Sequence, residues 1–164
     1  MKTKLFIFFI SIFQMTYSQN QGNKWYFGYM SALDFNGGSP PVSISGCQII
    51  PLSQGTGWYL HNEGTSSISD NLGNLLFYSE GQNIWNSNNQ LMPNGSGLMG
   101  CYSSTTSSYI IPVPLSDSLF YLFTTDCLEN NLANGLRYSI IDMCLEKGLG
   151  DVIINKKIFY YLIR

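Results

Sequence analysis

The chain has 164 residues, of which 45% are hydrophobic and 15% aromatic, while only 11% are charged. Ten acidic residues outnumber eight basic ones, and this balance argues against nucleic acid as a partner, because phosphate binding needs clustered Lys and Arg. The scarcity of charge also disfavours long exposed helices. Abundant Asn, Ser, Thr and Gly suit short strands joined by tight turns, so we expect an all-β fold.

The first 18 residues have the layout of a secretory signal peptide. Lys2 and Lys4 form a positively charged start, residues 5–13 form an apolar core, and Thr16 and Ser18 are the small or polar residues that follow. The apolar run is too short for a membrane span, which needs about 20 residues, and no later stretch of the sequence is long and apolar enough. We therefore predict a signal peptide over 1–18, export through the inner membrane, and no membrane span.

Short strands are predicted along the rest of the chain. The first lie at 25–28 and 32–35, before a Gly- and Pro-rich stretch at 36–41 that ends regular structure. Two hairpins follow, with strands at 66–69 and 75–79 and at 109–113 and 119–124, each joined by turn-forming residues. Additional strands are expected at 42–50, 58–60, 84–86, 136–143, 152–154 and 158–163.

The two hairpins contain the same triplet, since Leu76-Phe77-Tyr78 is matched by Leu119-Phe120-Tyr121. Ile158-Phe159-Tyr160 is a third, partial match without a preceding hairpin. A period of about 40–50 residues with several short strands is typical of propeller blades. We therefore predict a partial β-propeller-like array of about three four-stranded repeats. A β-sandwich is the alternative, because it also has short strands at regular spacing.

The predicted domain spans residues 19–164, and we expect it to be incomplete. Three repeats are fewer than the roughly 4–8 blades that close a propeller. The sequence also ends in an apolar run at 159–163, and an unpaired hydrophobic edge invites aggregation. We interpret the chain as the front part of a longer protein, with closure by self-association as the alternative.

Four groups of motifs together resemble the N-terminal propeller-like region of large exported Bacteroidota proteins, which end in type IX secretion, gliding-motility-associated sorting domains. The resemblance covers roughly residues 23–157. The motifs are Trp25-Tyr26-Phe27-Gly28 with Leu33-Asp34-Phe35-Asn36; Glu63-Gly64-Thr65-Ser66-Ser67-Ile68-Ser69-Asp70 with Gly73-Asn74-Leu75-Leu76-Phe77-Tyr78; Ile84-Trp85-Asn86 with Met92-Pro93-Asn94-Gly95; and Gly135-Leu136-Arg137-Tyr138-Ser139-Ile140-Ile141-Asp142-Met143 with Gly148-Leu149-Gly150-Asp151-Val152.

This resemblance implies a secreted or cell-surface location and a role in binding or adhesion, without a catalytic motif to carry over. The chain differs from the family by having neither later modules nor a sorting domain. Asp117-Ser118-Leu119 also resembles the short O-glycosylation acceptor motif of Bacteroidota, so Ser118 is a candidate modification site.

Four cysteines bear on redox state and on metal binding. Export to an oxidising compartment permits disulfides, with buried free thiols as the alternative. If two disulfides form, three pairings are open and the sequence does not choose among them. No C-x-x-C motif is present and there is a single histidine, so we predict no metal site and no cofactor. The cysteines are Cys47, Cys101, Cys127 and Cys144.

Catalytic chemistry is not expected. His61 is the single histidine through which Ser-His-Asp or Cys-His catalysis would have to run, and its polar surroundings indicate a loop residue. A glycosidase needs two carboxylates held close together, whereas several of the carboxylates here lie in turns or at strand ends, where local backbone bonding is expected. The carboxylates considered are Glu63, Asp70, Glu80, Asp126 and Asp142.

We therefore predict a non-enzymatic, secreted or cell-surface binding or adhesion module. Its partner would be an extracellular glycan or protein, and Trp58 and Trp85 are the candidate aromatic residues for ligand stacking. The alternatives are a secreted glycan-acting enzyme and a non-functional fragment of a longer surface protein.

Overall fold

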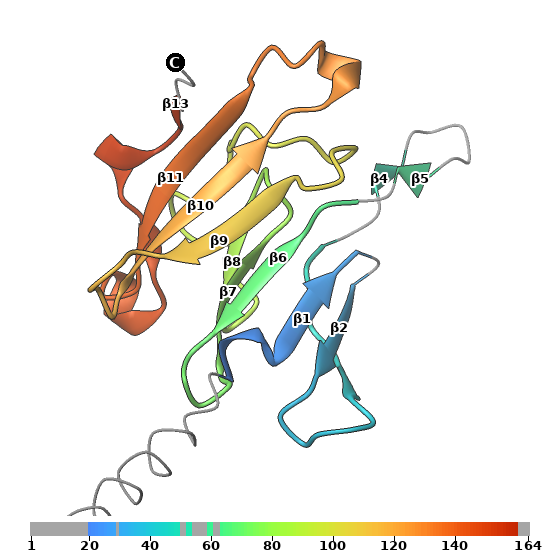
Figure 1. Ribbon diagram of the computed structural model, residues 1–164, viewed down its shortest axis with the longest axis vertical. Helices are drawn as coiled ribbons and strands as arrows, with labels where there is room; N and C mark the ends of the chain where they lie inside the picture. Colours follow the sequence, from blue (N-terminus) through green and yellow to red (C-terminus); the bar gives the residue numbers. More distant parts are fainter. Residues whose placement is uncertain (1–19, 29, 50–51, 54–58, 61–62, 161–164) are drawn as a thin grey trace, which may run out of the picture.

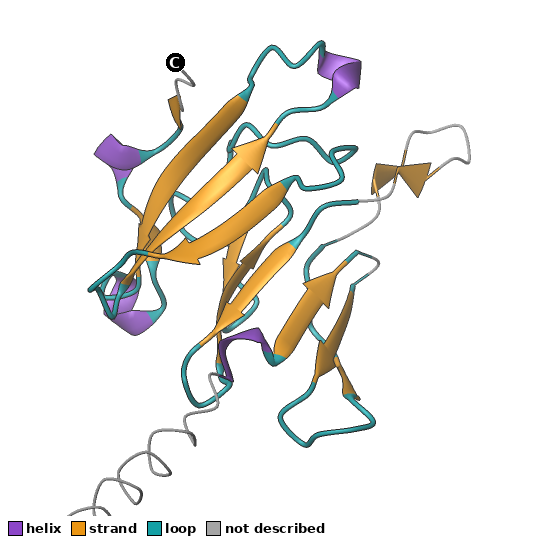
Figure 2. Cartoon of the chain, in the orientation of Figure 1, coloured by secondary structure: helices purple, strands orange, loops and turns teal. Residues whose placement is uncertain are grey.

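The computed structural model describes residues 20–28, 30–49, 52–53, 59–60 and 63–160. The predicted signal peptide, Trp58 and His61 lie outside this described part. The chain is all-β, and its described residues contain strands and short 3-10 turns but no α-helix (Figures 1 and 2).

The N-terminal sheet is antiparallel and follows the 3-10 turn η1 (Asn20–Gly22). Its strands lie in the order β1 (Lys24–Phe27), β2 (Ser31–Asp34) and β3 (Val42–Ile44). The third strand is shorter than the predicted 42–50. A separate small ladder joins β4 (Leu52–Ser53) to β5 (Tyr59–Leu60).

The middle sheet contains the first predicted hairpin, which is confirmed. Its strands are β6 (Ser66–Ser69), β7 (Leu75–Ser79) and β8 (Ile84–Asn86), in that order. One carboxylate oxygen of Asp70, Oδ1, accepts hydrogen bonds from the backbone N–H groups of Leu72 and Asn74, both at 2.8 Å. The side chain thus fixes the tight turn between β6 and β7, as expected for Asp at this position.

The C-terminal sheet contains the second predicted hairpin, which is also confirmed. Its antiparallel path runs β9, β10, β11 and β12, and β13 pairs with β11. The 3-10 turns η2, η3 and η4 lie in its connections (Figure 1). The bounds are β9 (Ser108–Pro112), β10 (Leu119–Thr125), η2 (Leu128–Asn130), β11 (Leu136–Asp142), η3 (Glu146–Gly148), β12 (Asp151–Val152), η4 (Ile154–Lys156) and β13 (Phe159–Tyr160).

The middle sheet is covered on both faces. Adjacent residues of β7 point to opposite sides of the sheet, and each side packs against another sheet. Phe77 is fully buried against the C-terminal sheet, and its ring meets that of Phe120 edge-on at 5.4 Å. Tyr78 points the other way, and its ring stacks on Tyr26 of the N-terminal sheet at 4.3 Å. Two apolar clusters therefore hold three sheets together.

A propeller is not shown, because no sheet closes a ring in the described part of the chain, and face-to-face packing fits the β-sandwich-like alternative. The three main sheets have three, three and five strands rather than four each. The repeated triplets do lie on the central strands β7 and β10. Propeller blades are related by rotation, so equivalent residues of neighbouring blades would point in the same direction around the ring. Phe77 and Phe120 instead point toward each other.

Hydroxyl side chains join the first strands of the three main sheets, which lie side by side (Figure 1). Ser67 Oγ on β6 donates to Lys24 O at 2.7 Å and accepts from Tyr26 N at 3.3 Å, while Thr65 Oγ1 donates to Tyr26 O at 3.0 Å. The backbone groups on this edge of β1 are therefore hydrogen-bonded to side chains instead of to a neighbouring strand. We call this set of contacts the hydroxyl seam.

The seam continues from β6 to β9. Ser66 Oγ lies 2.8 Å from Ser108 Oγ, which in turn donates to Ser79 O at 2.9 Å. Since the Ser108 proton goes to Ser79 O, Ser66 donates to Ser108. The backbone also approaches closely here, because a Cβ at Gly64 would lie 2.0 Å from Ser107 N.

Two serines on β6 are expected to respond oppositely to replacement by alanine. Ser67→Ala should lower the free energy of unfolding by about 1–3 kcal/mol, because Lys24 O and Tyr26 N lose their partner. Ser69 Oγ is buried and makes no hydrogen bond to the described residues, so Ser69→Ala should leave stability unchanged or raise it. Urea denaturation of both variants measures the difference, and equal destabilisation would contradict this account of the seam.

Candidate functional site

A groove of about 440 Å³ opens where β1, β6 and β9 lie side by side. Residues of β6 and the residue before it contribute three hydroxyl side chains, Thr65, Ser66 and Ser67, while β1 and β9 flank β6 (Figure 1). The described residues that line the groove include no Asp, Glu, Lys, Arg or His. It is therefore an uncharged recess with polar and aromatic lining.

Trp25 lines the groove from β1, with its side chain 54% exposed. Its indole N–H donates to Gly22 O at 2.8 Å, and its ring centroid lies 4.9 Å from that of Phe35. Tyr26 next to it is buried, because successive strand residues point to opposite faces. The indole is thus held in a fixed position while about half of its surface faces solvent.

Tyr109 lines the groove from β9 and is 58% exposed. The hydroxyl makes no hydrogen bond within the described part of the chain. The next residue, Ile110, packs against the apolar cluster between the middle and C-terminal sheets, which holds β9 in place. The ring and hydroxyl of Tyr109 are therefore available to a bound molecule.

Of the two predicted stacking residues, Trp85 is described and does not line this groove. Trp85 on β8 is partly buried, and its ring stacks on Tyr78 at 5.4 Å, so one of its faces is occupied. Trp58 lies outside the described residues. Trp25 and Tyr109 line the groove but were not selected from the sequence as stacking candidates. The signal available was the alternation that places Trp25 opposite Tyr26.

Ser118 lies in the turn between β9 and β10, as predicted, and is partly exposed. Its carbonyl oxygen accepts a hydrogen bond from Met143 N at 2.9 Å. O-glycosylation of its hydroxyl stays a prediction.

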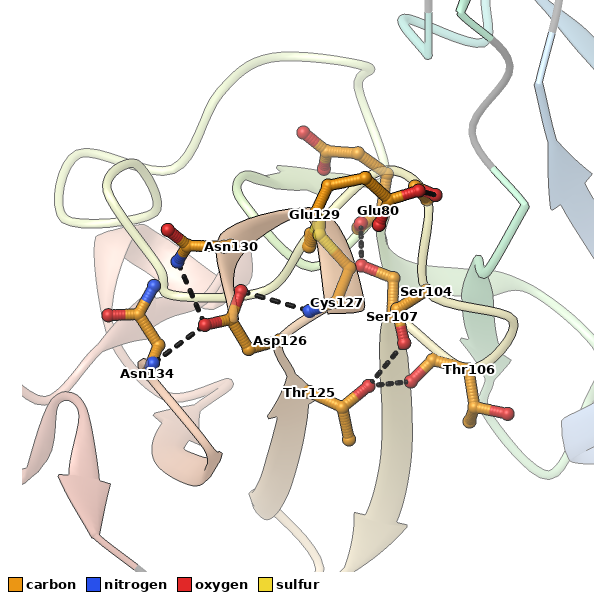
Figure 3. The surroundings of a disulfide bond; sticks show 12 residues. Glu80, Ser104, Thr106, Ser107, Thr125, Asp126, Cys127, Glu129, Asn130 and Asn134 are labelled. Atoms are coloured by element: carbon orange, nitrogen blue, oxygen red, sulfur yellow. Dashed lines mark hydrogen bonds between the residues drawn. A yellow bond between two sulfur atoms is a disulfide. The ribbon is translucent and has the colours of Figure 1, made fainter. Parts of the chain in front are cut away.

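A disulfide joins Cys101 to Cys127, a separation of 26 residues, and links the loop before β9 to the end of β10 (Figure 3). Cys144 is an exposed free thiol and Cys47 a buried one. Burial raises the pKa of the Cys47 thiol, so this group is inert rather than reactive. The Cys101–Cys127 bond is one of the cysteine pairings that the sequence left open.

A polar hollow of about 270 Å³ lies beside the disulfide. The Glu129 carboxylate is within 4.8 Å of both sulfur atoms, and Ser103 Oγ donates to it at 2.6 Å. Metal ions bind cysteine as thiolate, and here the two sulfurs are bonded to each other. In the oxidised protein this cluster is therefore a structural crosslink.

Asp126 organises the loop that follows β10 (Figure 3). The carboxylate accepts hydrogen bonds from Cys127 N at 3.0 Å, from Asn130 Nδ2 at 2.9 Å and from Asn134 N at 2.6 Å. Burial opposes ionisation, but these hydrogen bonds outweigh it and hold the pKa of Asp126 below its usual value. The carboxylate is thus committed to the fold of the loop.

Glu80, after β7, is a buried carboxyl, only 6% exposed. It accepts hydrogen bonds from the side-chain amide of Asn83 at 2.6 Å and from the backbone N–H of Asn83 at 3.0 Å. Burial raises the pKa of Glu80, although the bonds from Asn83 partly offset the effect. Like Asp126, this carboxyl is used to close a turn.

The raised pKa of Glu80 should make stability depend on pH. Between the ordinary carboxyl pKa of 4.5 and the raised value, the unfolded chain releases a proton that the folded chain retains. This contribution therefore destabilises the fold as pH rises through that window. We expect Glu80→Gln to gain stability relative to the parent from pH 4 to pH 7, as measured by urea denaturation. Parallel profiles of the two proteins would contradict this expectation.

No helix in the described part of the chain has the length and hydrophobicity needed to cross a bilayer.

No known protein family, curated protein or solved structure matches this chain.

Proposed function

We propose that this protein is a secreted or cell-surface, non-enzymatic binding module, with the groove between β1, β6 and β9 as its binding site. The observation that carries the proposal is the pair of half-exposed aromatic side chains, Trp25 and Tyr109, that line one recess from separate sheets. Binding pockets combine aromatic walls with a few polar groups that fix orientation.

Two further observations support parts of the proposal. The Cys101–Cys127 disulfide is of the kind that persists in oxidising, extracytoplasmic compartments, in keeping with the signal peptide predicted over 1–18. The carboxylates of Asp70 and Asp126 accept backbone hydrogen bonds that hold loops in place. This structural use favours a binding role over a catalytic one.

Export is tested by producing the full chain with a C-terminal tag in a Gram-negative host. The tagged product should reach the periplasm with a new amino terminus near Gln19, as determined by mass spectrometry. A cytosolic product that keeps residues 1–18 would contradict the proposed location.

Binding is tested on a panel of immobilised neutral polysaccharides, acidic polysaccharides and extracellular proteins. We expect at least one member to retain the protein, and Trp25→Ala to abolish retention. Tyr160→Ala is the matched control, because Tyr160 is 60% exposed but does not line the groove. Retention that is insensitive to Trp25→Ala, or no retention at all, would overturn the assignment of the groove.

A further inference from the structure

We infer that the groove binds a neutral saccharide; this inference rests on the proposed function and specifies its ligand class. The lining offers aromatic faces, hydroxyls and one carboxamide, without a charged side chain among the described residues. A sugar ring presents C–H bonds on one face and hydroxyl groups around its edge. The aromatic faces suit the C–H face of the sugar, and the hydroxyls and the carboxamide suit its hydroxyl groups.

Trp25 supplies a fixed surface for the C–H face of a sugar. Its indole N–H is already bonded to Gly22 O, so the remaining interaction that the side chain offers is contact with the ring face. The contact with Phe35 and this hydrogen bond hold the ring before ligand arrives. A side chain that is already immobilised loses little conformational entropy on binding.

Polar contacts would come from Gln21 and the seam hydroxyls. Gln21 lines the groove, and its carboxamide has no hydrogen-bond partner within the described residues. It offers two N–H donors and one oxygen acceptor, which suits a pair of neighbouring sugar hydroxyls. Ser66 and Ser67 each donate one hydrogen bond inside the protein, and each oxygen retains acceptor capacity for a ligand O–H.

The same contacts disfavour other ligand classes. An acidic sugar, sulfate or phosphate ester would require a cation, and the described lining holds none. An extended peptide that added to the edge of β1 would need free backbone groups. Tyr26 N, Tyr26 O and Lys24 O on that edge are already bonded to side chains of residues 65 and 67.

The test is isothermal titration of the exported protein with neutral oligosaccharides, namely cellohexaose, xylohexaose, mannohexaose and maltohexaose, and with polygalacturonate as the acidic comparison. We expect one neutral sugar to bind with quenching of tryptophan fluorescence. Trp25→Ala should weaken binding at least tenfold, and Gln21→Ala several-fold. Tyr160→Ala should bind as the parent does, and thermal melting checks that each variant is folded.

The outcomes separate this inference from the proposed function. If polygalacturonate or an immobilised protein binds in a Trp25-dependent manner while the four neutral sugars do not, the groove is a binding site and the saccharide inference is wrong. If a neutral sugar binds equally well to the parent and to folded Trp25→Ala, the assignment of the groove is wrong for both. Binding of a neutral sugar that is weakened in Trp25→Ala and in Gln21→Ala, and unchanged in Tyr160→Ala, supports both.

Discussion

Replacing Cys101 and Cys127 together by serine is expected to lower the free energy of unfolding by roughly 3–4 kcal/mol. The disulfide closes a loop with a sequence separation of 26 residues, and crosslinking a loop of this length removes a corresponding amount of conformational entropy from the unfolded chain. Because small domains are stable by only about 5–15 kcal/mol, the effect should be large. Urea denaturation of the variant and parent, both without reductant, measures it.

The control is Cys144→Ser, because Cys144 is an exposed free thiol. Its stability should stay within about 0.5 kcal/mol of the parent, as for most surface substitutions. If the double variant were as stable as this control, the Cys101–Cys127 crosslink would not contribute to the fold.

The second large effect is expected for Phe77→Ala, which should cost about 3–5 kcal/mol. Phe77 is fully buried between the middle and C-terminal sheets and contacts Phe120 edge-on. Truncation would remove apolar contacts and leave a cavity between the sheets. Urea denaturation is again the measurement, and Phe77→Leu, which removes less volume and should therefore cost less than Phe77→Ala, extends the series if the alanine variant does not fold.

Phe159→Ala is the matched control for this change. Phe159 is 42% exposed on β13, although its ring stacks on Tyr138 at 5.5 Å. Its truncation should therefore cost no more than about 1 kcal/mol. Similar losses at Phe77 and Phe159 would mean that the interface between the two sheets is not the main core.

The sequence was sufficient to locate most strands, because turn chemistry and alternation act over short distances. The hairpin at 66–79 was predicted within its observed bounds, since the Asp70 carboxylate and Gly73, which has a positive φ, specify its turn locally. The disulfide was not predictable, because which thiols meet depends on how the loop before β9 approaches the end of β10.

The candidate site was predicted less well than the fold. Alternation places Trp25 and Tyr26 on opposite faces, but which face is covered depends on packing against Tyr78, 52 positions further along the chain. The sequence therefore pointed to Trp85, whose ring is partly used in the same aromatic stack. Likewise, nothing in a run of serines indicates that Ser67 bonds an edge strand while Ser69 lacks a partner among the described residues.

The order of strands along the sheets bears on how the protein folds as its chain emerges amino end first, as every chain does during synthesis. In the N-terminal and middle sheets every ladder joins strands that are consecutive in the sequence, so all strands of each sheet can pair as soon as that segment of the chain has emerged. Local pairing of this kind favours rapid folding. The face of the N-terminal sheet that carries Tyr26 is buried only after Tyr78 has been added to the chain. Phe77 is buried later, when Phe120 becomes available to pack against it. A chain that emerges amino end first therefore buries these aromatic residues in the order in which they emerge.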